Sequence, residues 1–139
     1  MNINATIAKR FTFDAAHRLD RLPPEHKCHR MHGHTYEVEL VLRGPIDANG
    51  FVVDYADIEA AWRPIFETID HRVLNEVPGL EIPSTEVLAV WILNRLMSAG
   101  GDVARLLWKV RIKESSTTWC EVSVVSVGGV VESIPERSR

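Results

Sequence analysis

Hydrophobic and polar residues alternate along two stretches in the first third of the chain, and this alternation predicts two β-strands. Over residues 6–17, one face of the expected strand carries Phe11 and Phe13 and ends at His17. From residue 32 to about residue 43, apolar residues again recur at every second position. The intervening segment contains Pro-Pro and many charges, which predicts a loop. If the strands pair as an antiparallel hairpin, the end of the first lies beside the start of the second.

The middle of the chain changes to a helical period. Apolar residues recur at the i, i+3, i+4 and i+7 spacing between Asp54, a suitable N-cap, and Ile69, and Pro64 is expected to kink this helix or remove one hydrogen bond. A short strand is expected just before it, over residues 51–53. A second helix is predicted over residues 84–99, where Ser and Thr begin it and a Gly-Gly pair follows it.

Alternation returns over residues 106–114 and 119–127, which predicts two more strands. Glu114 falls at the end of the first of these, on the face expected to point inward. The apolar residues expected on that face are Leu106, Trp108, Val110 and Ile112. The order strand-strand-helix-helix-strand-strand predicts one α+β domain over residues 1–139, with a tail of little pattern after Gly128.

The amino-acid composition is that of a globular domain and gives no indication of a membrane-spanning or nucleic-acid-binding protein. The chain has 139 residues, 45% hydrophobic and 25% charged, which are ordinary globular values. Its formal net charge of -3 gives no general attraction to nucleic acid or to an anionic membrane. No apolar run approaches the roughly 20 residues of a membrane span, and the N-terminus does not resemble a signal peptide. Two distant cysteines make no disulfide framework, so we expect a cytoplasmic domain with reduced thiols.

Three histidines are predicted to converge at one end of the sheet. His32 and His34 share a strand face because side chains alternate along a strand, and hairpin pairing brings His17 beside them. Imidazole is the commonest zinc ligand, and three imidazoles with an open fourth position are typical of a catalytic zinc site. Cys28 leaves two alternatives: a fourth ligand that closes a structural zinc site, or a free thiolate that acts as base or nucleophile.

Two other polar positions bear on this choice. Asp70 and His71 follow the first helix and form either a local ion pair or a proton-transfer pair. Glu114 is either paired or functional, because burying a lone carboxylate is costly. A closed structural zinc site explains neither feature, so these residues favour the open, catalytic site.

On these residues the chain resembles the 6-pyruvoyltetrahydropterin synthase / 6-carboxytetrahydropterin synthase family. The resemblance runs in order from about residue 8 to residue 121. The matching segments are Phe13-Asp14-Ala15-Ala16-His17-Arg18-Leu19, Cys28 to Tyr36, Val53-Asp54-Tyr55, Asp70-His71-Arg72-Val73-Leu74-Asn75, Pro83-Ser84-Thr85-Glu86 and Lys113-Glu114-Ser115.

The resemblance implies roles for the catalytic and substrate-binding residues. Cys28 is the expected proton acceptor, with Asp70 and His71 as its relay partners. Glu114 is expected to accept hydrogen bonds from the amino and ring N–H groups of a pterin. Thr85 and its neighbours at the start of the second helix are expected to offer backbone contacts to the same ring.

The resemblance also implies the cofactor and the reaction. His17, His32 and His34 are the expected ligands of Zn²⁺. The implied reaction converts 7,8-dihydroneopterin triphosphate to 6-carboxytetrahydropterin, acetaldehyde and triphosphate, in queuosine (deazapurine) synthesis. Three residues separate Cys28 from the His-Gly-His motif, as in the 6-carboxy branch, whereas the 6-pyruvoyl enzymes have five. The alternatives are 6-pyruvoyltetrahydropterin synthase activity and a non-catalytic zinc module.

The fold that the resemblance implies is the tunnelling fold. In this fold a four-stranded antiparallel sheet has two helices inserted between its strand pairs (ββααββ). Subunits join their sheets into a barrel, and the sites lie at subunit contacts. The expected partners are therefore a small pterin and other copies of the chain, as a tetramer or hexamer, with no nucleic acid and no membrane.

Overall fold

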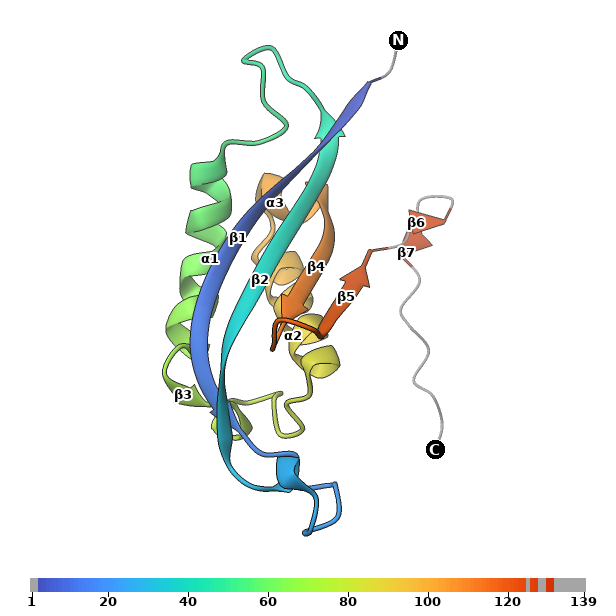
Figure 1. Cartoon of the computed structure of the whole chain (residues 1–139). Helices are drawn as coiled ribbons and strands as arrows, with labels where there is room; N and C mark the ends of the chain where they lie inside the picture. The colour runs from blue at the N-terminus through green and yellow to red at the C-terminus, as the bar shows by residue number, and fades with distance from the viewer. Residues whose placement is uncertain (1–2, 125, 128–129, 132–139) are drawn as a thin grey trace.

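A long β-hairpin is the centre of the fold in the computed structural model, which describes residues 3–124, 126–127 and 130–131 (Figure 1). β1 (Asn4–His17) pairs antiparallel with β2 (His32–Pro45) along its whole length, with His17 opposite His32 at one end. This confirms the predicted hairpin, and each strand extends two residues further than the alternation indicated.

The sheet has five strands in the order β3-β1-β2-β4-β5. β4 (Leu107–Lys113) pairs antiparallel with β2, and β5 (Trp119–Ser123) pairs antiparallel with β4. The expected four-stranded, wholly antiparallel sheet is wrong in one respect, because β3 (Arg72–Val73) runs parallel to β1 beside Ala15 and Ala16. The chain that leaves the first helix returns along the free edge of β1, and a two-residue pairing results.

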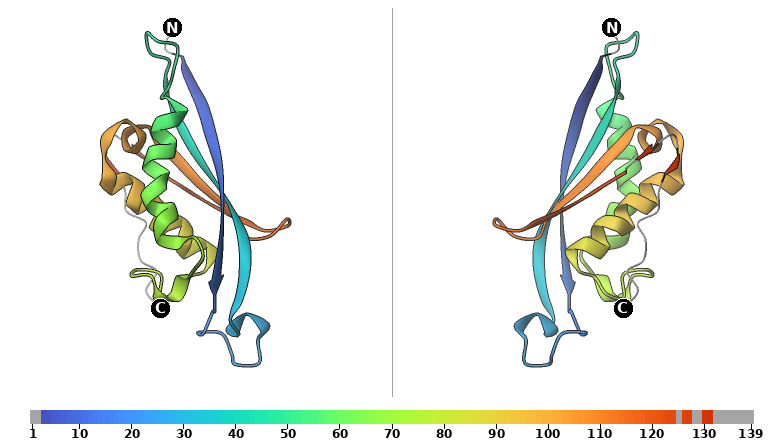
Figure 2. Two further views of the ribbon diagram at one scale, coloured as in Figure 1. Left: turned by 90° about the vertical axis from the view of Figure 1, so that its left-hand side faces the viewer. Right: turned by 90° about the vertical axis from the view of Figure 1, so that its right-hand side faces the viewer.

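Two long helices cover one face of the sheet and leave the other face open (Figure 2). They are α1 (Tyr55–Ile69) and α2 (Thr85–Ala99), and their limits agree with the sequence prediction. A third helix was not predicted: α3 (Gly101–Leu106) follows α2 directly. Gly100 separates the two helices and Gly101 begins α3; their φ values of 71° and 78° lie in the region that favours glycine. The apolar side chains of α3 that follow are buried in the core. Short 3₁₀ turns form at η1 (Lys27–His29) and η2 (Leu74–Glu76).

Both long helices begin at the predicted caps. The Asp54 carboxylate accepts a hydrogen bond from the Ala56 N–H at 2.9 Å, and the Ser84 hydroxyl accepts one from the Val87 N–H at 3.2 Å. Pro64 lies inside α1, which remains one helix to its end.

The register of β4 differs from the prediction. Leu106 belongs to α3, and the strand begins at Leu107, which is buried. An irregularity of pairing between Val41 and Leu42 shifts the alternation at this end of the strand. Trp108 therefore does not face the core as expected; its ring lies against the charged groups of Arg43, at 5.1 Å, and Lys109, at 4.1 Å.

Two other expected strands differ as well. Residues 51–53 form no strand, because the Asp47 carboxylate accepts hydrogen bonds from the N–H groups of Asn49 and Phe51 and closes a turn instead. The final strand, expected over residues 119–127, is described as β5 followed by β6 (Ser126–Val127), which pairs with β7 (Val130–Val131). Residue 125 and most of the tail after Gly128 lie outside the described residues.

The core lies between the helices and the covered face of the sheet. Phe13 and Tyr36 stack across the hairpin with ring centroids 4.8 Å apart, and Trp62 of α1 packs against Phe13. The open face instead carries charged residues, such as Arg10, which contacts Glu37 at 2.9 Å. Within the described ranges, no helix has both the length and the apolar character needed to cross a membrane.

Candidate metal and catalytic site

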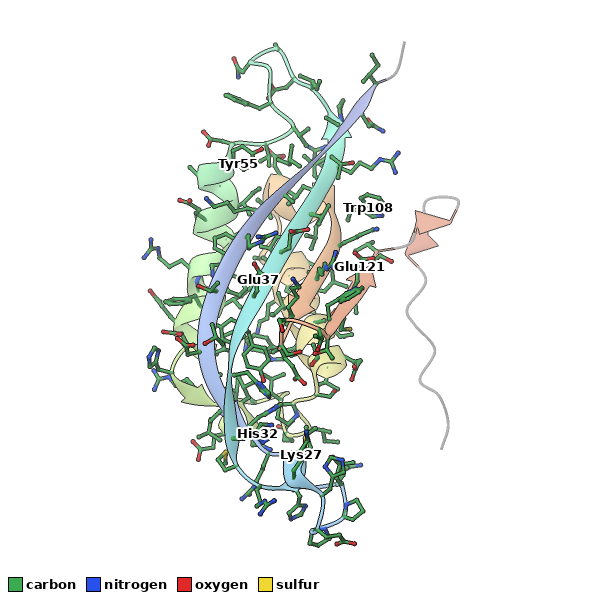
Figure 3. All side chains as sticks on the ribbon, viewed as in Figure 1. Lys27, His32, Glu37, Tyr55, Trp108 and Glu121 are labelled. Carbon is green, nitrogen blue, oxygen red and sulfur yellow. The ribbon has the colours of Figure 1, made fainter. Side chains whose placement is uncertain are left out.

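The hairpin brings three histidines together at one end of the sheet, where Figure 3 labels His32. His17 is the last residue of β1 and His32 the first of β2, and the two are directly paired. His34 lies two residues further along β2, on the same face. One ring nitrogen of each histidine lies within 4.8 Å of the others, and His17 is 1% exposed. This is the arrangement that the strand pairing predicts.

Backbone carbonyl groups determine the tautomers of two of these rings. Nδ1 of His17 lies 2.8 Å from the Pro83 carbonyl oxygen, and Nδ1 of His32 lies 2.7 Å from the Arg30 carbonyl oxygen. A carbonyl oxygen only accepts, so each Nδ1 carries the hydrogen and donates it. In the neutral form of each ring, Nε2 then carries a lone pair, and the Nε2 atoms of His17 and His32 lie 3.0 Å apart. Two lone pairs at this distance require a proton or a cation between them.

The third ring completes a set suited to a metal ion. Nε2 of His34 is buried and has no hydrogen-bond partner among the described residues. Burial lowers the pKa of His17, although the hydrogen bond to Pro83 opposes this, so its imidazole is neutral near pH 7. Neutral imidazoles whose second nitrogen donates to a carbonyl are the usual metal-binding form of histidine. The residues present therefore fit a zinc ion.

The start of α2 connects this cluster to Glu114. Pro83 holds His17 through its carbonyl, Ser84 caps the helix, and the Thr85 hydroxyl donates to Glu114 Oε2 at 2.8 Å. Glu114 follows β4, and its carboxylate lies 4.0 Å from His34 Nε2. Among the described residues, the carboxylate thus accepts a hydrogen bond from Thr85 and lies near His34, in agreement with the predicted paired or functional carboxylate.

Cys28 lies apart from the three rings. It belongs to η1, within the loop that extends beyond the ends of β1 and β2 (Figures 1 and 2). Its N–H donates to His26 Nδ1 at 3.0 Å, and its carbonyl accepts from the Leu19 N–H at 2.8 Å. The thiol is half-buried and free, and it is not in the group of ligand atoms that the three histidines form. This geometry favours the free thiol over the fourth-ligand alternative.

Asp70 and His71 form a hydrogen-bonded pair at the end of α1. His71 Nδ1 lies 2.8 Å from Asp70 Oδ2, and the His71 side chain is 77% exposed. The hydrogen bond and the charge of Asp70 raise the pKa of His71. Burial acts to raise the pKa of Asp70, but a hydrogen bond from the Asp14 N–H and the proximity of His71 outweigh it and lower that pKa.

The His71 side chain of this pair borders an open groove of about 520 Å³. The groove is lined by Asp14, Ala15, Ala16, Gly33, His34, Thr35, His71, Arg72 and Val73. Within one chain, the described side chains of Asp70 and His71 cluster with Asp14 and not with Cys28. The structure thus unites the residues expected at the metal but separates Cys28 from its expected relay partners.

Sequence reasoning missed the partners that hold these groups. The carbonyls of Arg30 and Pro83 carry no side-chain signal, so only tertiary structure reveals them. Asp14 and Thr35 lie opposite each other on the hairpin, and the Thr35 hydroxyl donates to Asp14 Oδ1. In the sequence, the one indication that Asp14 and Thr35 lie near the site is their closeness to the histidines: Asp14 is three residues before His17, and Thr35 directly follows His34.

Comparisons with known proteins identify the family to which this chain is similar. The family model of 6-pyruvoyl tetrahydropterin synthase matches residues 6–124. A Synechocystis protein named 6-carboxy-5,6,7,8-tetrahydropterin synthase is 36% identical over 102 residues, which cover 68% of this chain and 76% of that protein. A Pyrococcus furiosus protein named dihydroneopterin monophosphate aldolase is 33% identical over 102 residues, which cover 73% and 83% of the two chains.

A solved structure is similar in both fold and sequence. The Caenorhabditis elegans 6-pyruvoyl tetrahydropterin synthase superposes with a TM-score of 0.81 at 27% identity, over 88% of this chain and 96% of that one. The family match spans the hairpin, both long helices and β4, and so includes every residue of the candidate site. The chain therefore belongs to the 6-pyruvoyl tetrahydropterin synthase family.

Proposed function

We propose that this protein is a zinc-dependent carbon–carbon lyase that converts 7,8-dihydroneopterin triphosphate to 6-carboxy-5,6,7,8-tetrahydropterin, acetaldehyde and triphosphate, in queuosine biosynthesis. The observation that carries the proposal is the convergence of three imidazoles, with the Nδ1 atoms of two of them held by carbonyls, beside a carboxylate. The branch rests on the three-residue spacing between Cys28 and the His-Gly-His motif, and on relatives that bear the 6-carboxy name.

The metal centre would be held by His17, His32 and His34. Three neutral nitrogen ligands with room for a further ligand are the usual donor set of catalytic zinc. When bound, zinc supplies a Lewis acid that stabilises negative charge on an oxygen of the substrate. The carbonyls of Pro83 and Arg30 would keep the Nε2 atoms of two rings directed at it.

Glu114 would bind and orient the pterin. A carboxylate accepts two hydrogen bonds side by side, which matches the adjacent N–H donors on the edge of a pterin ring. Thr85 donates to one of its oxygens and so fixes the carboxylate in place. The short distance from Glu114 to His34 supports a geometry in which the ring is held at this carboxylate while the side chain of the substrate extends toward the histidines.

Cys28 would accept the proton, and Asp70 with His71 would relay it. Because these groups lie apart within one chain, we infer that His71 acts on Cys28 of a neighbouring subunit. Two sheet edges support such an assembly. β3 pairs with only two residues of β1, and β5 has a single neighbouring strand within the described part of the chain. Edges with free backbone groups favour pairing between copies, as in the barrel of the tunnelling fold.

Two alternative activities have specific support. The family model and the C. elegans structure carry the 6-pyruvoyl name, which favours elimination of triphosphate without carbon–carbon cleavage. The P. furiosus relative favours aldol cleavage of a monophosphate substrate. The closed zinc module is disfavoured, because Cys28 is not in the ligand group.

Product analysis tests the proposal directly. The zinc-loaded protein is incubated in parallel with dihydroneopterin triphosphate and with dihydroneopterin monophosphate, and the products are identified by mass spectrometry. The expected result is 6-carboxytetrahydropterin with an equal amount of acetaldehyde from the triphosphate. A pyruvoyl product without acetaldehyde, or turnover of the monophosphate alone, would refute the assignment.

A further inference from the structure

Asp14 contacts both members of the Asp70–His71 pair through its backbone. The Asp14 N–H donates to Asp70 Oδ1 at 3.1 Å, and the Asp14 carbonyl accepts from the His71 N–H at 2.6 Å. The parallel pairing of β1 with β3 begins only at the next residue, Ala15. The backbone N–H and C=O groups of Asp14 therefore bind Asp70 and His71 instead of extending the pairing between β1 and β3.

The side chain of Asp14 is held in turn by β2. The Thr35 hydroxyl donates to Asp14 Oδ1 at 2.5 Å, and the two residues are directly paired on the open face of the hairpin. A carboxylate oxygen of Asp14, one of Asp70 and a ring nitrogen of His71 lie within 4.8 Å of one another. Two carboxylates from separate elements thus converge on one imidazole.

His71 has an unusual backbone conformation. Its φ of 56° is the only positive value for a non-glycine residue in the ranges that the structure describes. A helix that ends in this conformation usually has Gly or Asn at that position, since a side chain is disfavoured there. Strain of this kind persists where surrounding contacts hold it and is typical of functional sites. The contacts that hold it here come from Asp14 and Asp70.

We propose that Asp14, fixed by Thr35, is a positioning residue that orients His71 and favours its protonated form. The inference deepens the proposed function, because it concerns the proposed proton relay. The Asp70 carboxylate is hydrogen-bonded to the His71 ring, a carboxylate oxygen of Asp14 lies near the ring, and His71 lines the groove. The other charged or titratable groups at this groove are Arg72 from β3 and His34 from β2. In agreement, the charge of Asp14 adds to the effect of Asp70 in raising the pKa of His71.

The test is an NMR titration of His71 in the zinc-loaded protein without substrate, paired with the pH profile of kcat. In Asp14→Asn, the oxygen that accepts from Thr35 is kept while the charge is removed, and the titration midpoint of His71 is expected to fall. The kcat is expected to fall about tenfold with KM unchanged, less than the roughly 10²–10⁴-fold loss on removing a proton-transfer group itself. Asp102→Asn, an exposed carboxylate in α3, is the matched control.

Thr35 provides the second pair of variants. Thr35→Val removes the hydroxyl and is expected to shift the His71 titration in the same direction as Asp14→Asn, whereas Thr35→Ser keeps the hydroxyl and restores the wild-type midpoint. Thr12→Val, on the same face of β1, is the control for a lost surface hydroxyl. If His71 titrates alike in Thr35→Val, Asp14→Asn and both controls, the inference is overturned. The titration needs no turnover, so its result is independent of whether the proposed reaction occurs.

Discussion

Backbone carbonyl groups orient two of the three histidines of the proposed zinc site, so each ring offers its Nε2 atom to the same point. His34 differs, since its Nε2 atom is buried without a hydrogen-bond partner among the described residues. An unpaired buried nitrogen costs free energy unless a ligand satisfies it. These three residues would therefore be stabilised by zinc, and the fold itself prepares them for it.

The variant Cys28→Ala separates catalysis from metal binding. We expect turnover to fall by about 10²–10⁴-fold, because a proton-transfer group is lost, while the protein keeps its zinc. Metal content by atomic emission and steady-state kinetics measure the two effects. Cys120→Ala, at the other free cysteine, is the matched control. Loss of stoichiometric zinc from Cys28→Ala would show that the sulfur is a ligand.

The Asp70–His71 pair makes stability depend on pH in a defined direction. The pKa of His71 is raised, so its contribution is full below the ordinary histidine value and is lost as the pH rises through the raised value. The pKa of Asp70 is lowered, so its contribution is present above the ordinary aspartate value and is lost as the pH falls through the lowered value. The Asp70–His71 pair therefore stabilises the fold most at pH values above the ordinary aspartate pKa and below the ordinary histidine pKa.

Thermal unfolding of Asp70→Asn across pH tests this expectation. The difference in Tm from wild type should be largest at mildly acidic pH, between the ordinary aspartate and histidine values, and should shrink as His71 loses its proton. Asp57→Asn, in the first turn of α1, serves as the control. A Tm difference that stays constant from acidic to alkaline pH would contradict the assigned pair.

At the scale of elements, the start of α2 controls the geometry of the site. Three consecutive residues there make the relevant contacts. The Pro83 carbonyl accepts a hydrogen bond from His17, the Ser84 hydroxyl caps the helix, and the Thr85 hydroxyl donates to Glu114. The helix is fixed against the sheet by buried Leu88 and Ile92. A shift of this helix would move both the ring of His17 and the carboxylate of Glu114, so the proposed metal and pterin positions would be coupled through one turn of helix.

Ser84→Ala tests this coupling. Loss of the cap is expected to lower the free energy of unfolding by about 1 kcal/mol and Tm by a few degrees. The KM for the pterin substrate is expected to rise, because the first turn of the helix no longer holds Thr85 in position to bind Glu114. Ser98→Ala, on an exposed site near the end of the same helix, should change neither. A drop in Tm with an unchanged KM would show that the cap supports the helix but not the site.

At the scale of the whole molecule, the proposed site is incomplete in one chain. Cys28 lies in η1, between the two strands of the hairpin, whereas His71 directly precedes β3 and its N–H donates to the Asp14 carbonyl of β1. The strand β3 lies at the edge of the sheet (Figure 1). The edge strand β5, and the edge of β1 that β3 covers over only two residues, provide surfaces through which copies can join. A symmetric assembly would repeat the same contact and build every site from two neighbours.

Mixing two inactive variants tests for shared sites. Cys28→Ala and His71→Ala are each expected to be inactive alone, but co-refolded in equal amounts they should regain activity at roughly a quarter of the sites, where both intact residues meet. Mixing Cys28→Ala with the double variant is the control and should give none. Absence of recovery in a mixture that forms mixed oligomers, as seen by native mass spectrometry, would show that each site belongs to one chain.

The hairpin, the two long helices and the convergence of the histidines could all be predicted from the amino-acid sequence. Strand alternation has a strict period of two, so pairing of β1 with β2 dictates that His17 meets His32 and His34. The N-caps at Asp54 and Ser84 could also be predicted from the sequence, because a capping side chain binds a backbone N–H group no more than three residues away.

Features that depend on contacts between distant parts of the chain could not be predicted and became visible in the folded structure. The parallel strand β3, the helix α3 and the shifted register at Trp108 arise from how segments pack on the hairpin, and local pattern does not encode this. The same holds for the carbonyls that orient the rings and for Asp14 beside His71, since backbone groups and residues 57 positions apart leave no joint periodic signal in the chain. The physical reason is that periodicity reports which face of an element is buried, whereas the chemistry of the site depends on which elements meet.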